Sequence, residues 1–239
     1  MDLVIDILLL GIVGIVTWLL ANEGPWTAIL AFFSVVFAGL IAMNFFEPLA
    51  EMIGKPKGSW LETRADFLAL MGLFALFTFL LRLGLDNVAP TNIELPDIAY
   101  QAGRWLFAFG TGYVAMAVVL TAMHTAPLPR NFLGFKPERK NFLGVMSPDL
   151  QWLGFTQHVT EHIFGRRIRV QNQNNQMELS YRNFDGLRVL FPGRPSSDYL
   201  PTFIIRYASR RDEIGGIAPR PVPVQAAPSS GGPAAGPAF

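Results

Sequence analysis

Four long apolar runs fill the first half of the chain, and they limit its fold more than any other feature. Each has about 18 residues or more, enough to cross a hydrocarbon core of ~30 Å as a helix rising ~1.5 Å per residue. Their apolar residues are clustered and not periodic, which indicates lipid as the surrounding solvent. The composition agrees, because 51% of the 239 residues are hydrophobic and 15% are charged. We therefore predict an all-α integral membrane protein with four transmembrane helices, at about residues 3–20, 26–46, 65–83 and 99–123.

The first apolar run could also be a cleaved signal peptide. Such a peptide needs a positively charged start, and no Lys or Arg occurs before Lys55. We therefore expect a helix that is retained in the membrane. The chain has no cysteine, which excludes disulfides, thiolate metal sites and cysteine nucleophiles.

Charge is divided unevenly along the chain, and this division predicts an orientation. Residues 1–125 carry 5 Lys/Arg and 10 Asp/Glu, whereas residues 126–239 carry 14 and 8. The connections at 21–25 and 84–98 contain no Lys or Arg, but the connection at 47–64 contains three. Because Lys and Arg accumulate in cytoplasmic loops, we predict that both termini and the 47–64 loop lie in the cytoplasm.

After the transmembrane domain of residues 1–125, we interpret residues 126–216 as a basic cytoplasmic tail. Its cations are expected to contact anionic lipid headgroups. They are scattered and accompany no nucleic-acid motif, so no nucleic acid is expected. Residues 217–239 are mostly Pro, Ala, Gly and Ser, which is typical of a disordered end. The cations expected at the membrane surface are Arg130, Lys136, Arg139 and Lys140.

Within this tail, residues 148–164 are predicted to form an amphipathic helix. Ser147 can cap its start, Pro148 suits its first turn, and Gly165 can end it. Four apolar residues share one face, and the helix is expected to lie either on the bilayer surface or against the cytoplasmic ends of the spans. These four residues are Trp152, Phe155, Val159 and Ile163.

Short β-like pieces also occur in the tail. They lie at 168–170, 177–181, 187–191 and 203–207, separated by breaks rich in Asn, Gln, Pro or Gly. This pattern is consistent with short strands and a small sheet. The apolar sequence here is too sparse for a large core.

Two segments of the tail nearly repeat each other. Residues 130–134 read Arg-Asn-Phe-Leu-Gly, and residues 140–144 read Lys-Asn-Phe-Leu-Gly. Two interpretations stay open. Either the likeness is a coincidence in a basic loop, or both segments are turns that insert phenylalanines into the membrane interface.

Small residues at helical spacing mark two predicted packing faces. In the second run Ser34, Ala38 and Ala42 are spaced four apart, and the fourth run carries a glycine-rich surface. Small side chains let helices approach closely in lipid, where no hydrophobic force drives association. Helix packing is the expected use, and lining of a pore is the alternative. The surface of the fourth run comprises Gly103, Ala108, Gly110 and Gly112.

Five ionisable residues lie within or at the ends of the spans. Such groups are costly in a bilayer and are functional candidates by default. Three are predicted near the cytoplasmic ends, where anchoring or pairing between helices is expected and proton or ion handling is the alternative. The two arginines are predicted on the opposite side, where Asp86 and Asp97 are candidate partners. The five are Asp6, Asp66, Arg82, Arg104 and His124.

His158 and His162 belong to an H-x-x-E-H sequence, a pattern found in some metalloproteases. Two histidines four apart on a helix could share a metal, but a zinc site needs a third protein ligand. The region downstream shows little sign of an enzyme fold, so a helix flank touching water or headgroups is the preferred interpretation. No P-loop, dinucleotide-binding or nucleophile-elbow motif is present. We expect no cofactor and no enzymatic activity.

Taken together, these features resemble a known family. Four spans begin at the N-terminus, the second ends in Asn-Phe-Phe-Glu-Pro-Leu-Ala at 44–50, and the last is glycine-rich and opens near Arg104. This order resembles the CvpA family, the colicin V production proteins of bacterial inner membranes. The resemblance covers about residues 1–125. It departs at 21–25, because the basic turn that usually follows the first span in this family has no basic residue here.

The resemblance implies a non-enzymatic protein of the bacterial inner membrane, linked to toxin production or export or to membrane-associated scaffolding. An oligomeric channel or transporter component is the alternative function, and a membrane metallohydrolase is a third. The expected partners are the lipid bilayer, a second copy of the chain, or another membrane protein.

Overall fold

The computed structural model describes residues 2–54, 60–88, 96–129, 132–135, 142–162, 168–171, 177–180, 188–190 and 199–214. Four of its helices are long and apolar enough to cross a membrane, which confirms the four predicted spans. A helix pairs its backbone groups within the segment, as lipid requires. All four extend beyond the predicted bounds. They are α1 (Asp2–Glu23), α2 (Pro25–Ile53), α3 (Ala65–Val88) and α4 (Asp97–Thr125).

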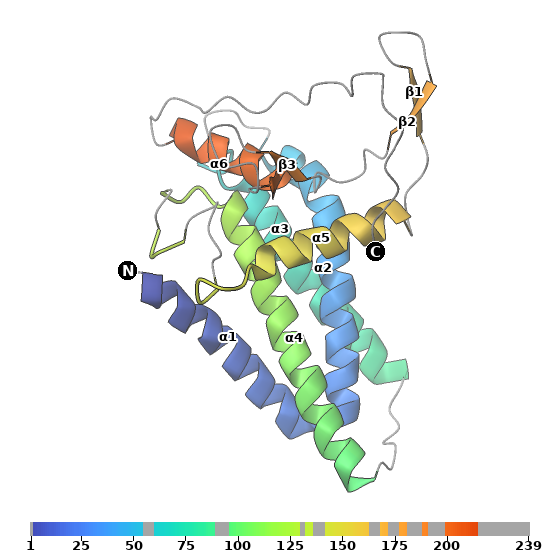
Figure 1. Ribbon diagram of the computed structural model, residues 1–239. Helices are drawn as coiled ribbons and strands as arrows, with labels where there is room; N and C mark the ends of the chain where they lie inside the picture. The colour runs from blue at the N-terminus through green and yellow to red at the C-terminus, as the bar shows by residue number, and fades with distance from the viewer. Residues whose placement is uncertain are drawn as a thin grey trace, which may run out of the picture.

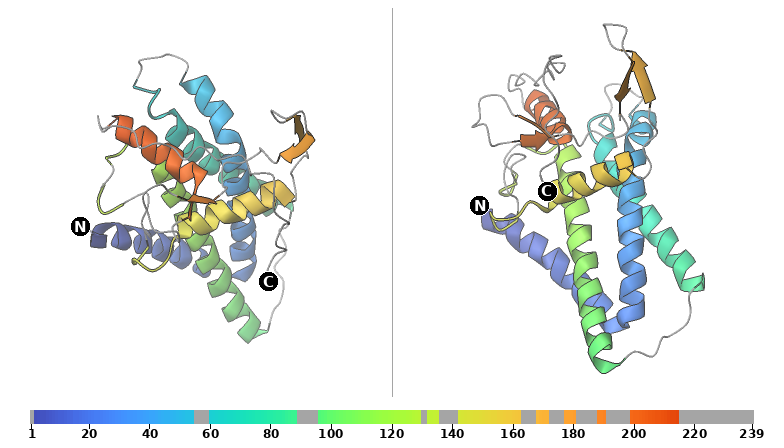
Figure 2. Two further views of the ribbon diagram at one scale, coloured as in Figure 1. Left: turned by 45° about the horizontal axis from the view of Figure 1, so that its top comes forward. Right: turned by 45° about the vertical axis from the view of Figure 1, so that its right-hand side comes forward.

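These helices are arranged in the order α1–α4–α2–α3 (Figures 1 and 2). Consecutive spans are joined as hairpins, yet the main packing partners are α1 with α4 and α2 with α3, and α4 also packs against α2. The two inner helices, α2 and α4, bury far more of their surface than the two outer ones. The outer faces of α1 and α3 are therefore the natural surfaces for lipid.

Small residues lie where the inner helices meet their neighbours. On α2, Ser34, Ala38 and Ala42 are all buried. On α4, a methyl group added at Gly112 would lie 2.9 Å from the backbone oxygen of Val13 on α1. Glycine at this position lets the two backbones approach closely, as expected for helix packing in lipid.

Two helices of the tail cover one end of this row, which we call the capped end. Helix α5 (Pro148–His162) crosses α4 and α2, and α6 (Thr202–Ile214) lies beside the C-terminal end of α4 (Figure 1). The opposite end, where α1 meets α2, we call the turn end. The predicted helix at 148–164 is thus present over 148–162 and packs against the spans, and its last two predicted residues, including Ile163, lie outside the described residues. The predicted disordered end at 217–239 lies outside the described residues.

Four short strands occur between α5 and α6 in the sequence. Strands β1 (Ile168–Gln171) and β2 (Met177–Ser180) form one antiparallel pair, and β3 (Arg188–Leu190) and β4 (Tyr199–Pro201) form another. The fourth predicted strand, at 203–207, is wrong because these residues belong to α6. Buried residues recur in α6 with a helical period, which outweighs the strand propensity of its two isoleucines. They are Phe203, Ile204, Tyr207, Ala208, Arg211 and Asp212, and Ile205 is buried as well.

The described parts of the two nearly repeated segments, from Phe132 and from Phe142, form similar tight turns. Leu133 and Leu143 both have φ of 52°, and each is followed by a glycine with positive φ. Phe135 and Phe142, which flank these turns, are buried against α1 and α4. Phe142 belongs to the second segment, and its insertion into the membrane interface is contradicted because the protein's own helices cover it. Phe132, the phenylalanine of the first segment, is partly buried.

Candidate functional site at the capped end

Helix α5 packs its most buried face against the spans, and this face mixes apolar and polar residues. Trp152 lies against Gly39 of α2, where an added methyl group would be 2.5 Å from the indole ring. Near the other end of α5, the Asn44 amide donates to the Thr160 hydroxyl at 3.3 Å. Phe155, predicted to share the packing face, is instead 42% exposed. Glycine at position 39 therefore sets how closely α5 can approach α2.

A buried acid–base pair joins α4 to the start of α5. His124 Nε2 lies 2.8 Å from Asp149 Oδ2, and each side chain is 1% exposed. Asp149 lies in the first turn of α5, where the helix dipole favours a negative charge. The ring of Phe135 meets the imidazole edge-to-face, with centroids 4.9 Å apart. His124 was predicted to anchor the end of its span, and its partner comes from the tail.

Arginines fix α6 to the ends of three spans. Arg206 pairs with Glu47 of α2, and Arg210 pairs with Asp66 of α3. Arg211 donates to backbone carbonyls at the C-terminal end of α4, including Ala126 O at 3.2 Å from its Nε. Cations suit this position because the last carbonyls of a helix carry partial negative charge.

Tyr207 lies on the same helix and packs against the Phe203 ring, with centroids 4.8 Å apart. Burial, and next the carboxylate of Asp66, raise the pKa of the Tyr207 hydroxyl well above its ordinary value. The phenol is therefore neutral throughout the physiological pH range. The positive charge that α6 places near Asp66 therefore comes from the arginines of α6.

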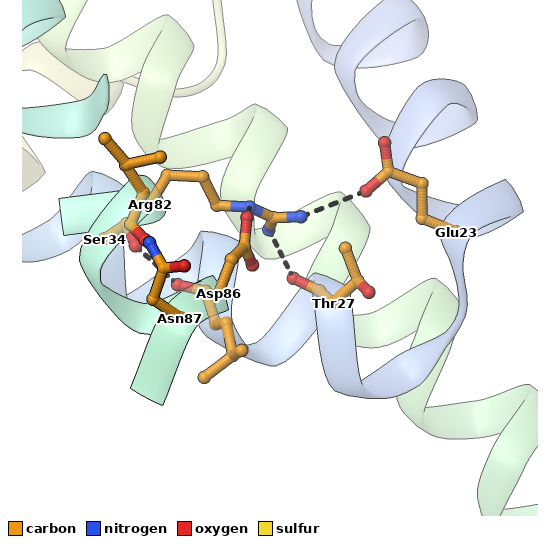
Figure 3. Close-up of polar contacts among 8 residues, drawn as sticks. Glu23, Thr27, Ser34, Arg82, Asp86 and Asn87 are labelled. Atoms are coloured by element: carbon orange, nitrogen blue, oxygen red, sulfur yellow. Dashed lines mark hydrogen bonds and ion pairs between the residues drawn. The ribbon is translucent and has the colours of Figure 1, made fainter. Parts of the chain in front are cut away.

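At the turn end, Arg82 of α3 gathers contacts from three helices (Figure 3). Its Nη2 lies 3.1 Å from Glu23 of α1, its Nη1 donates to the Thr27 carbonyl of α2 at 2.9 Å, and its Nε lies 2.9 Å from Asp86. The predicted partner Asp86 is thus present. Glu23, from the first span, was not anticipated.

The other ionisable residues have separate surroundings. Asp6 accepts a hydrogen bond from the Leu143 amide at 2.8 Å, so the second turn of the tail rests on α1. Arg104 is half-buried, with its guanidinium 5.5 Å from the centroid of Trp105, and no described residue bonds to its Nε. The five predicted residues therefore occupy both ends of the spans and form no continuous path among the described residues.

The described residues give little support to the hypotheses of a metal site and of a pore. His158 is exposed on α5, and the side chain of His162 is outside the described residues. Among the described residues, no group of three metal-ligating side chains occurs. On α4, Ala108 is buried, and methyl groups added at Gly103 and Gly110 would touch Pro25 and Phe32 of α2. The glycine-rich surface thus contacts neighbouring helices of its own chain.

Several contacts at the capped end were not foreseen from sequence. The role of Arg206 was missed because 203–207 was interpreted as a strand, and Arg210 and Arg211 followed that strand with no predicted element. Arg206 and Arg210 are four apart, a spacing that places two side chains on one face of a helix and could have revealed them. The predicted surface cations Arg130, Lys136, Arg139 and Lys140 lie outside the described residues.

No protein-family model matches this chain, and neither a curated protein nor a solved structure matches it.

Proposed function

We propose that this chain is a non-enzymatic, multi-pass scaffold of a bacterial inner membrane, similar in kind to the CvpA proteins, with its capped end in the cytoplasm. The cytoplasmic placement is supported by the Lys/Arg counts. Three Lys/Arg occupy the 47–64 connection at the capped end, and none occupies the 21–25 and 84–98 connections at the turn end.

One observation carries the scaffold proposal: the tail is fixed to the spans from both of its helices. The His124–Asp149 pair holds the start of α5, and Arg210 with Asp66 holds α6. The two antiparallel strand pairs lie between these helices in the sequence. A segment held at both ends is suited to present a binding surface at a defined place on the membrane.

Lipid is the first expected partner of the tail. Leu143, Val145 and Met146 are exposed next to the start of α5. Apolar side chains beside a cationic tail are typical of segments that insert into the headgroup region of an anionic leaflet. The link to toxin production or export follows from the family resemblance alone and is kept as part of the proposal.

Site-specific photo-crosslinking in native membranes tests the scaffold. A photoreactive residue at Glu213, exposed on α6, should capture a protein, whereas one at Phe79, exposed on α3, should capture mainly lipid. The variant Arg210→Ala with Arg211→Ala should release α6 and lose the protein adduct while keeping its membrane insertion. Equal capture with and without these substitutions would count against a fixed platform.

A topology assay is the matched control. A reporter fused at Gln225 should be active only on the cytoplasmic side, and one inserted at Thr91 only on the opposite side. The reverse result would remove the proposed orientation. Ion flux through proteoliposomes of the purified chain would instead favour the channel alternative.

A further inference from the structure

A cavity of about 630 Å³ lies where α5 crosses α2 and α4. Helix α2 supplies one wall, α4 the second, and α5 closes the groove. Two of its polar side chains pair with each other, because the Tyr113 hydroxyl donates to the Gln151 side-chain carbonyl. The indole Nε1 of Trp152 is buried without a hydrogen-bond partner among the described residues. The remaining wall is apolar and includes Phe33, Phe37, Val114 and Trp152. A polar ligand would find few partners here, whereas a hydrocarbon needs none.

The groove is continuous with the surface that the spans present to lipid. Phe33 and Phe37 of α2 are about half exposed, and Phe155 of α5 is similarly exposed on the other side. Trp152, which also lines the groove, is only 4% exposed. The space thus has an exposed rim and a deep wall, so material from the bilayer can enter without crossing a polar barrier.

The direction and size of the groove fit a lipid tail. On α2 its wall runs from Phe32 to Leu40, or ~12 Å along a helix that rises ~1.5 Å per residue. An acyl chain runs in the same general direction as a membrane-spanning helix. The volume lies within the ~300–1,000 Å³ that is usual for small-molecule pockets.

We propose that this groove binds one acyl chain of a phospholipid from the leaflet in which α5 lies. The chain enters past the exposed phenylalanines and contacts Trp152 at the deep wall. This inference rests on the proposed insertion of the four spans. It adds a specific lipid site at the junction between the tail and the membrane domain.

Photo-labelling in nanodiscs tests the proposal. The probe is a phosphatidylglycerol with a diazirine in its acyl chain, and adducts are located by peptide mass spectrometry. Labelling of Trp152 reports on the groove, because bulk lipid does not reach this side chain. Labelling of Phe79, which is 64% exposed on α3, reports on bulk lipid. The native chain should be labelled at both residues.

Substitutions that fill the groove distinguish it from the rest of the surface. Val114→Trp, and independently Val36→Trp, should abolish the Trp152 adduct and leave the Phe79 adduct unchanged. The matched control Val4→Trp, at an exposed position of α1, should change neither adduct.

Two other labelling results in the native chain would contradict the proposal in different ways. Labelling of Phe79 without Trp152 in the native chain would refute the acyl-chain site while the spans remain inserted. Loss of both adducts would refute the membrane insertion itself.

Discussion

The imidazole of His124 and the carboxylate of Asp149 lie 2.8 Å apart, and neither side chain reaches solvent. The two residues belong to the last span and to the first turn of α5. The pair therefore connects the membrane domain to its tail. Each of the two side chains is the hydrogen-bond partner of the other. Breaking the pair leaves a buried polar group without its partner.

Asp149→Ala should destabilise the protein by ~1–3 kcal/mol, the usual penalty for an unpaired buried polar group. His124→Ala should have a similar effect. The double variant should lose less than the sum of the single variants, with a coupling of ~0.5–3 kcal/mol for groups in contact. Unfolding by SDS in mixed micelles measures all four proteins. If the losses of the two single variants simply add in the double variant, the coupling free energy between His124 and Asp149 is zero and the prediction is wrong.

Gly39→Ala should displace α5 from α2, because the new methyl group would lie 2.5 Å from the indole ring of Trp152. The absence of native cysteine allows a simple measurement. A thiol introduced by Leu153→Cys, at a fully buried position of α5, should be protected from maleimide in the native background and reactive with Gly39→Ala. Gly72→Ala, where the added methyl group meets nothing within 4 Å, should leave the thiol protected.

Gly112→Ala should weaken the packing of α1 on α4. The added methyl group meets the backbone of Val13, at 2.9 Å from its oxygen, and a backbone cannot rotate away as a side chain can. Gly14→Ala on α1 enters open space and should be neutral or slightly stabilising. A disulfide between cysteines placed on facing positions of α1 and α4 should form more slowly only in the first variant. Equal rates would mean that this contact is not tight.

Arg82→Ala should destabilise the turn end mainly through the lost hydrogen bond to the Thr27 carbonyl. Glu23 and Asp86 are each about half exposed, so their ion pairs are worth only ~0–1 kcal/mol after solvent screening. We therefore expect Arg82→Ala to lower the thermal midpoint more than Glu23→Gln or Asp86→Asn. High salt should abolish the effects of the two acid variants and retain part of the arginine effect.

Docking of α6 should weaken at high pH. Burial, and next the charge of Asp66, raise the pKa of Tyr207 in the folded protein. A group whose pKa is raised on folding stabilises the fold fully below its unfolded pKa of ~10, and this stabilisation is lost as the pH rises through the folded pKa. Thermal midpoints in detergent should therefore fall above about pH 10. Tyr207→Phe should reduce this fall, and an unchanged alkaline profile would contradict the assignment.

The number and positions of the spans could be predicted because lipid demands long apolar helices. The order of the spans could not, since runs that are apolar on all sides carry no helical period to show which face meets which neighbour. Only exceptional residues such as Gly112 indicate which face of a span is packed. A glycine shows that a helix lies close by, but its type alone does not identify which helix that is.

In the tail, the predicted helix at 148–164 was present but its packing face was only partly correct. Sequence reasoning places apolar residues inward, whereas Asp149 and Thr160 are buried and Phe155 is exposed. Residues 203–207 were misassigned because a short apolar run fits a strand and a buried helix equally well. Both errors occur where contacts with the spans outweigh local preference.

The pairing of α1 with α4 has a consequence for biosynthesis. At ~5–20 residues per second, a ribosome completes α1 several seconds before it reaches Asp97, where α4 begins. During that interval the first helix waits in the membrane without its principal neighbour. Lateral closure of α4 onto α1 is thus a late event in biogenesis, and a truncation before residue 97 would leave α1 available to insertases, proteases or other nascent chains.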